Sequence, residues 1–123
     1  MRRRKLHGLG STFTQHFKQA EKSGKKALSV IEEAQAYLKG AQSGTKDKRA
    51  ACELALGTYA AGLIHYGKFS AHNEEAEDLL EEVQDRLYTE SEKFEEALHK
   101  TCFIGKKPPA YGDRLDGMRK RRR

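Results

Sequence analysis

Tryptophan is absent from this chain of 123 residues, which also has only two prolines, two cysteines and two methionines. The scarcity of proline argues against a disordered, proline-rich linker, and two cysteines are too few for a disulfide scaffold. Hydrophobic residues make up 37% and charged residues 34% of the chain, which is too polar a mixture for a membrane protein. These absences leave one charged domain with a narrow core.

Motifs that carry enzyme or metal chemistry are also missing. The sequence has no nucleophile elbow, and Gly8-Leu9-Gly10 alone is too short for a phosphate-binding loop. A structural zinc site needs four ligands, whereas His99 and Cys102 form only a pair. His65 and His72 are seven residues apart, a spacing that we interpret as packing on one helix face. We therefore expect no catalytic activity, no cofactor, no bound metal and no small-molecule substrate.

The excess of positive over negative charge is confined to the two ends of the sequence. Residues 1–10 contain four basic and no acidic residues, and residues 103–123 contain eight basic and two acidic residues. The segment between them, 11–102, contains 12 basic and 16 acidic residues. This distribution predicts a body of residues 11–102 with two basic arms, which is typical of proteins that engage polyanions.

Apolar residues recur at alternating steps of three and four from Phe13 to Ala41, which predicts a helix over residues 12–41. Ser11 or Thr12 can cap its start, and the segment Gly40–Thr45 is expected to end it. We expect the helix to continue through Gly24, which lies in the apolar stripe and allows a neighbouring helix to approach closely.

A second helix is predicted over residues 46–69. Between Ala50 and Tyr66 its only charged residue is Glu53, so we expect this segment to be buried on more than one side. Gly57 and Gly62 would let partner helices pack closely against it. The apolar stretch is shorter than the roughly 20 residues that a membrane span needs, and no membrane association is expected.

A third, acidic helix is predicted over residues 73–102, after a turn at 67–73. Its apolar stripe is in phase with that of the second helix, so a single long rod covered by other subunits is the alternative. The fold class is all-α: an antiparallel three-helix bundle or a long helical hairpin. Residues 1–10 and 103–123 are expected to be irregular, since glycine interrupts the first arm and Pro108 and Pro109 the second.

The cysteines are expected to be free thiols. A turn near residue 71 places Cys52 opposite residue 91, about 11 residues from Cys102, or roughly 16 Å along a helix. That separation is beyond the reach of a disulfide. The N-terminal basic run is not followed by the apolar segment of a secretory signal, so we expect a reducing, intracellular setting and no secretion.

The basic arms are the predicted nucleic-acid-binding residues. Arginine donates several fixed hydrogen bonds to phosphate oxygens, and arginine clusters without interleaved aromatic residues favour contact with the backbone over base stacking. Within the body, Lys18, Lys22 and Lys25 share one helix face. The predicted nucleic-acid-binding set comprises Arg2, Arg3, Arg4, Lys5, Lys106, Lys107, Arg114, Arg119, Lys120, Arg121, Arg122 and Arg123.

Four large apolar residues flank the arms and are predicted to dock on protein. The core is thin, because alanine and glycine occupy many stripe positions, so contact with another protein or with a second copy is expected to supply further burial. The docking residues are Phe13, Phe17, Phe103 and Ile104.

The opening Arg2-Arg3-Arg4-Lys5-Leu6-His7-Gly8-Leu9-Gly10 resembles the start of small helical proteins encoded by microviruses, the tailless bacteriophages with single-stranded DNA. The resemblance implies a phage setting, in the virion interior or the host cytoplasm, beside packaged single-stranded DNA. The function we predict is a non-catalytic structural virion protein whose arms neutralise genome phosphates while its body docks on capsid, another virion protein or itself. The alternative is a helical protein interaction or oligomerisation module that does not bind nucleic acid.

Overall fold

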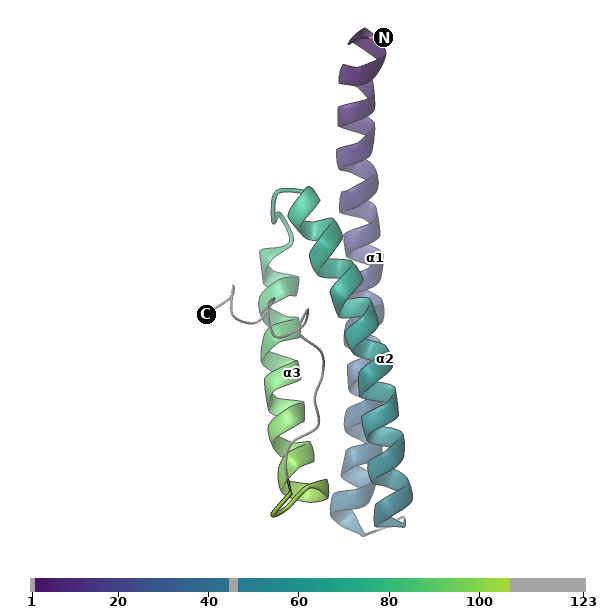
Figure 1. Ribbon diagram of the computed structural model, residues 1–123, viewed down its shortest axis with the longest axis vertical. Helices are drawn as coiled ribbons and strands as arrows, with labels where there is room; N and C mark the ends of the chain where they lie inside the picture. The colour runs from purple at the N-terminus through teal and green to yellow at the C-terminus, as the bar shows by residue number, and fades with distance from the viewer. Residues whose placement is uncertain (1, 45–46, 107–123) are drawn as a thin grey trace.

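The computed structural model describes the backbone of residues 2–44 and 47–106, and side-chain burial from residue 12 onward. These residues form three helices and no strand: α1 (Arg2–Ser43), α2 (Lys48–Glu75) and α3 (Glu81–Cys102). The all-α prediction is confirmed. Helices α1 and α2 run antiparallel as a long hairpin, α3 turns back alongside α2, and the N-terminal part of α1 extends beyond both (Figure 1).

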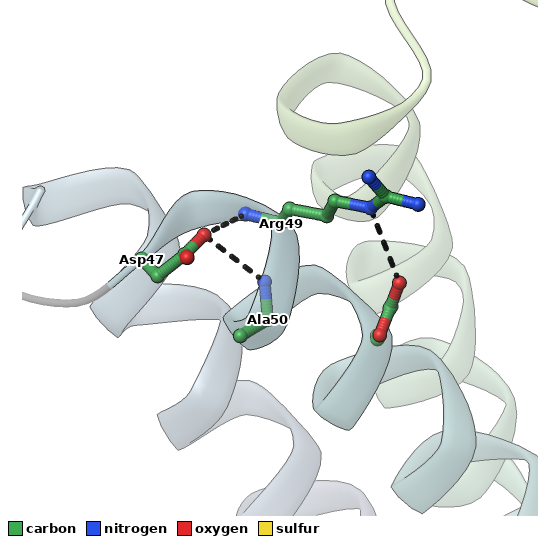
Figure 2. A network of polar contacts seen from close by, with 4 residues as sticks. Asp47, Arg49 and Ala50 are labelled. Carbon is green, nitrogen blue, oxygen red and sulfur yellow. Dashed lines mark hydrogen bonds and ion pairs between the residues drawn. The ribbon is translucent and has the colours of Figure 1, made fainter.

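The turn between α1 and α2 lies where the sequence predicts it. α1 ends at Ser43, and Gly44 follows with a φ of 72°, a left-handed conformation that glycine adopts without steric cost. Asp47 then caps α2, because its carboxylate accepts hydrogen bonds from the backbone N–H groups of Arg49 and Ala50 (Figure 2). Asp47 thereby pairs two of the backbone N–H groups that the start of α2 would otherwise leave without a partner.

One apolar face from each helix forms the core. The predicted stripe of α1 is buried from Ala20 onward, whereas its first members, Phe13 and Phe17, are half-buried. The stripe of α3 is narrow, and Phe94 stacks on Tyr59 of α2 with ring centroids 4.4 Å apart. The fully or largely buried residues at the centre are Ala20, Ala27, Ile31, Ala34, Leu38, Ala55, Tyr59, Tyr66, Phe69, Leu87, Phe94 and Leu98.

Gly24 lies where all three helices meet. A Cβ at this position would lie 2.8 Å from Cγ1 of Val83 in α3 and 3.0 Å from Cδ1 of Phe69 in α2. The predictions that α1 continues through Gly24 and that a neighbour approaches closely there are both confirmed. Gly62 of α2 has the same role against Val30 and Ile31 of α1.

The break between α2 and α3 lies at 76–80 rather than at the predicted 67–73. Gly67 is buried inside α2, and Asn73 organises the break without ending the helix. The carbonyl oxygen of Asn73 accepts from the backbone N–H of Asp78, and its side-chain Oδ1 accepts from the N–H of Leu80. Helices α2 and α3 are therefore separate elements, and the alternative of one continuous rod is wrong.

The prediction of an irregular N-terminal arm is also wrong, because residues 2–10 continue α1 as helix. Each glycine at positions 8 and 10 costs about 1 kcal/mol of helix propensity, but glycine neither removes a hydrogen-bond donor nor clashes with the preceding turn as proline does. The backbone of Arg2, Arg3 and Arg4 therefore forms the start of helix α1. Residues 107–123 of the C-terminal arm lie outside the described residues.

The prediction of two free thiols is wrong as well. Cys52 of α2 and Cys102 of α3 form a disulfide, with an S–S distance of 2.09 Å and a Cα–Cα distance of 6.0 Å. The error follows from the misplaced turn. In an antiparallel helix pair, moving the break by six residues moves the residue opposite Cys52 by twice as many, from residue 91 to about residue 103.

α2 is less enclosed than the sequence indicates. Its inward residues are buried against α1 and α3, but Leu54 and Ile64 on the outward side are 49% and 62% exposed. The predicted burial of residues 50–66 on more than one side is therefore incorrect for this outer face. Among the described helices, none has an apolar stretch of the length that crossing a bilayer requires.

Candidate nucleic-acid interface

The outer face of α1 carries a cluster of lysines. Lys18, Lys22, Lys25 and Lys26 are all exposed. Lys18, Lys22 and Lys25 lie on the side of the helix opposite the buried Ala20 and Ala27, as the steps of four and three residues require. None of the four forms an ion pair with any other described residue. Their charge is available to an external anion.

Helix α2 adds His65 and Lys68 to this basic surface. The pKa of His65 is lowered from its ordinary value first by partial desolvation and then by the positive charges of Lys68 and Lys26. Lys26 belongs to α1 and Lys68 to α2, so the histidine reports a positive potential that spans both helices. We call Lys18, Lys22, Lys25, Lys26, His65 and Lys68 the basic face.

The titration of His65 tests this positive potential. The pKa of His65 is lower in the folded than in the unfolded protein, so the unfolded chain binds more protons while His65 titrates. The free energy of unfolding therefore decreases slightly as the pH falls, and the decrease is complete below the folded-state pKa of His65. We expect Lys68→Gln, and raised salt in the parent protein, to move the pKa of His65 upward toward 6.5. NMR titration of the His65 ring protons measures it, with Lys93→Gln on α3 as the control. An unchanged pKa in Lys68→Gln would contradict the electrostatic coupling.

Charge is distributed unevenly over the body. α1 contains nine basic and three acidic residues, whereas α3 contains seven acidic and three basic residues. The contacts between these helices include the ion pair between Arg86 and Glu32 and the hydrogen bond from the side-chain amide of Gln35 to Glu90. A polyanion approaching the molecule would be attracted to α1 and repelled by α3.

The structure separates the two groups of predicted arm residues. Arg2, Arg3, Arg4 and Lys5 lie in the part of α1 that extends beyond the other helices (Figure 1). Lys106 is exposed just after α3, at the opposite end of the bundle. The remaining predicted contacts lie outside the described residues: Lys107, Arg114, Arg119, Lys120, Arg121, Arg122 and Arg123. The N-terminal group is thus on the same helix as the basic face, and Lys106 is remote from it.

The four predicted docking residues differ in accessibility. Phe13, Phe17 and Phe103 are half-buried, and Phe103 packs against the core. Ile104 is 70% exposed. Phe103 and Ile104 help to line an open groove of about 720 Å³ beside the disulfide, whose rim includes Lys48, Arg49 and Lys106. Arg49 forms an ion pair with Glu53 of the same helix, with a distance of 3.5 Å between Nε and Oε1 (Figure 2).

His65 and His72 both belong to the continuous helix α2, where a separation of seven residues places them on one helix face. His72 packs against α1, and its Nδ1 lies 2.9 Å from Nδ1 of His16, near the point where α1 leaves the bundle. One ring nitrogen must donate and the other accept in this contact. Within the described part of the chain, no three His, Cys, Asp or Glu side chains are grouped to hold a metal ion.

Sequence reasoning identified three of the basic-face lysines but not the contribution of α2. His65 and Lys68 are about 40 residues from Lys26 in sequence, and only the register of the α1–α2 hairpin brings them together. Comparison with known protein families, with curated proteins and with solved structures finds no match to this chain.

Proposed function

We propose that this protein is a non-catalytic, nucleic-acid-associated structural protein that binds the phosphate backbone through α1 and the basic arms. The observation that carries the proposal is the cluster of four exposed lysines on α1 that have no acidic partner among the described residues. Lysines one helical turn apart can follow a phosphate backbone without reading bases. The acidic α3 would orient the molecule with α1 toward the polyanion.

The N-terminal resemblance to microvirus proteins supports a place in a phage virion, where the partner would be a single-stranded DNA genome. In that setting the basic residues neutralise packaged phosphates. The helical body would contact capsid, another virion protein or a second copy, and exposed Ile104 is one residue available for such contact.

The test is the salt dependence of nucleic-acid binding. The observed affinity falls with salt with a log–log slope of about 0.7 per phosphate contact on single strands and about 0.9 on duplex. Replacing Lys18, Lys22, Lys25 and Lys26 with glutamine should therefore flatten the slope by about 2.8 on single-stranded and about 3.6 on duplex DNA. Fluorescence anisotropy between 50 and 300 mM salt, with an oligonucleotide of random sequence, measures it.

A matched control removes the same charge from elsewhere. Arg86, Lys93 and Lys100 of α3 and Lys48 at the start of α2 lie away from the basic face, and their replacement with glutamine should leave the slope within about one contact of the parent. Deleting residues 119–123 tests the C-terminal run separately, with an expected loss of about 3.5 in slope on single strands. Equal effects of the two quadruple variants would show non-specific attraction by net charge and contradict a site on α1.

The alternative function, an interaction module without nucleic-acid binding, makes a different prediction for the same titration. It is favoured if the parent protein shows no salt-dependent affinity at 50 mM salt while self-association or partner binding persists. The exposed apolar face of α2 is the observation that supports it.

A further inference from the structure

The Cys52–Cys102 disulfide lies at the surface of the bundle and not in its core. Both cysteines are half-buried, and both line the open groove of about 720 Å³ that also contains Phe103 and Ile104. Sites for small molecules typically have volumes of about 300–1,000 Å³, so the groove has room for one. We call it the disulfide groove. A small thiol can therefore approach the disulfide while the protein remains folded.

The disulfide groove has a positively charged rim. Lys48, Arg49 and Lys106 line it, and Glu53 is the one acidic residue among its described lining residues. Glu53 pairs with Arg49, whereas neither Lys48 nor Lys106 forms an ion pair with a carboxylate of the described residues. Asp47 does not line the groove, and its carboxylate is bonded to backbone N–H groups at the start of α2. The groove therefore attracts anions.

The two sulfur atoms of the disulfide have different surroundings. Cys52 follows Lys48 by four residues and Arg49 by three, so both cations lie on its side of α2, close to the positive end of the helix. These charges stabilise a thiolate on Cys52. Cys102 is the last residue of α3, where the negative end of the helix disfavours a thiolate. Cys52 is therefore the better leaving group when a nucleophile attacks the disulfide.

From these observations we propose that the disulfide groove is a site of thiol–disulfide exchange with a small thiol that carries carboxylate groups. The thiolate of the incoming molecule attacks Sγ of Cys102 and forms a new S–S bond, while the Cys52–Cys102 bond breaks. The electron pair of the broken bond leaves on Cys52, which takes up from water a proton equivalent to the one that the incoming thiol lost. One disulfide is consumed and one is formed, so the step needs no oxidant.

The exchange removes the covalent tie between two helices. The disulfide joins α2 near its start to the last residue of α3, and the mixed disulfide on Cys102 leaves that end of α3 held by packing alone. The basic C-terminal arm begins in sequence at residue 103, so the exchange acts where the arm joins the body. The proposal is independent of whether α1 binds nucleic acid.

The test compares glutathione, which carries two carboxylates, with the neutral thiol 2-mercaptoethanol. Acid quenching and mass spectrometry of the full-length protein measure the rate of exchange with each thiol. Both rates should rise in proportion to thiol concentration. The ratio of the glutathione rate to the 2-mercaptoethanol rate should fall at least about threefold in Lys48→Gln/Lys106→Gln, because only glutathione has carboxylates for the rim to attract. Raised salt should lower the same ratio in the parent protein.

The matched control is Lys22→Gln/Lys93→Gln, which removes one lysine from α1 and one from α3, neither of them in the groove. Its ratio of rates should equal that of the parent protein. A ratio that is the same in the parent protein and in both variants would overturn the proposal. So would rates independent of thiol concentration, because exchange would then require prior unfolding.

Peptide mapping of the acid-quenched intermediate tests which sulfur is attacked. We expect glutathione to be attached to Cys102, with Cys52 as the free thiol. Glutathione found mainly on Cys52 would overturn the assignment of Cys52 as the leaving group.

Discussion

Reduction of the Cys52–Cys102 disulfide is expected to lower the free energy of unfolding by about 4 kcal/mol. The bond joins residues 50 apart in sequence, and the chain-entropy treatment of a loop of that length gives about this value, because the cross-link restricts the unfolded chain. Natural domains have only about 5–15 kcal/mol of net stability, so the disulfide represents a large share.

The composition of the core makes this dependence stronger. Of the sixteen buried hydrophobic residues among those described, seven are alanines, each of which removes little apolar area from water. The disulfide also joins α2 near its start to the last residue of α3, at the end of the bundle away from the α2–α3 break. Together the break and the disulfide hold both ends of α3 against α2.

Urea unfolding with and without a reducing agent measures the effect. The double variant Cys52→Ala/Cys102→Ala is the control for the chemistry of reduction, and it should match the reduced parent protein and not respond to the reductant. A loss of less than about 1 kcal/mol on reduction would show that the unfolded chain is already compact, or that the thin core is sufficient by itself.

The sequence predicted the elements better than their register. The apolar stripe of α1, the turn at Gly44 and the close approach at Gly24 all follow from local spacing, because each depends on residues within one helix or one turn. The position of the α2–α3 break depended on which of several candidate turn positions ends α2, and the sequence does not decide between them. Gly67 and Asn73 look like turn residues, yet the positive φ angles of the break fall at Glu77 and Asp78.

That single misplacement accounts for the error at the cysteines. A break centred near residue 77 brings Cys52 beside Cys102 and Tyr59 beside Phe94 and Glu95, whereas a break near residue 71 brings neither pair together. The candidate site likewise contains one feature that a single helix shows and one that depends on the register between helices. The repeated lysines of α1 are visible as a pattern in one helix, but their proximity to Lys68 and His65 requires the register between two helices.

Replacing Phe94 with alanine is expected to destabilise the protein by about 3–5 kcal/mol, the range for truncating a buried aromatic residue. Phe94 is 1% exposed and is the largest buried side chain that α3 contributes. Its ring stacks on Tyr59 of α2. The Tyr59 hydroxyl in turn hydrogen-bonds to the carbonyl oxygen of Ser91 and to the Glu95 carboxylate on either side of Phe94. Loss of the ring therefore leaves a cavity and loosens the neighbouring polar contacts.

α3 depends on Phe94 more than its length suggests. Only Leu87, Ser91, Phe94 and Leu98 are buried on this helix, and its other contacts to α1 include exposed ion pairs and hydrogen bonds of small value. We therefore expect Phe94→Ala to release the middle of α3 while the α1–α2 hairpin and the disulfide persist. Native-state hydrogen exchange should show faster exchange in residues 87–98 than in the centre of α1.

Chemical denaturation provides the total loss, and Ile104→Ala provides the matched control. Ile104 is 70% exposed, so its truncation should change the free energy of unfolding by no more than about 0.5 kcal/mol. A loss below about 1 kcal/mol in Phe94→Ala would mean that Tyr59 and Leu98 close over the space that the ring leaves. In that event α3 would be held mainly by the disulfide and not by the packing of Phe94. Reduction of the Phe94→Ala variant tests this, because α3 should then be released completely only if the disulfide is what holds it.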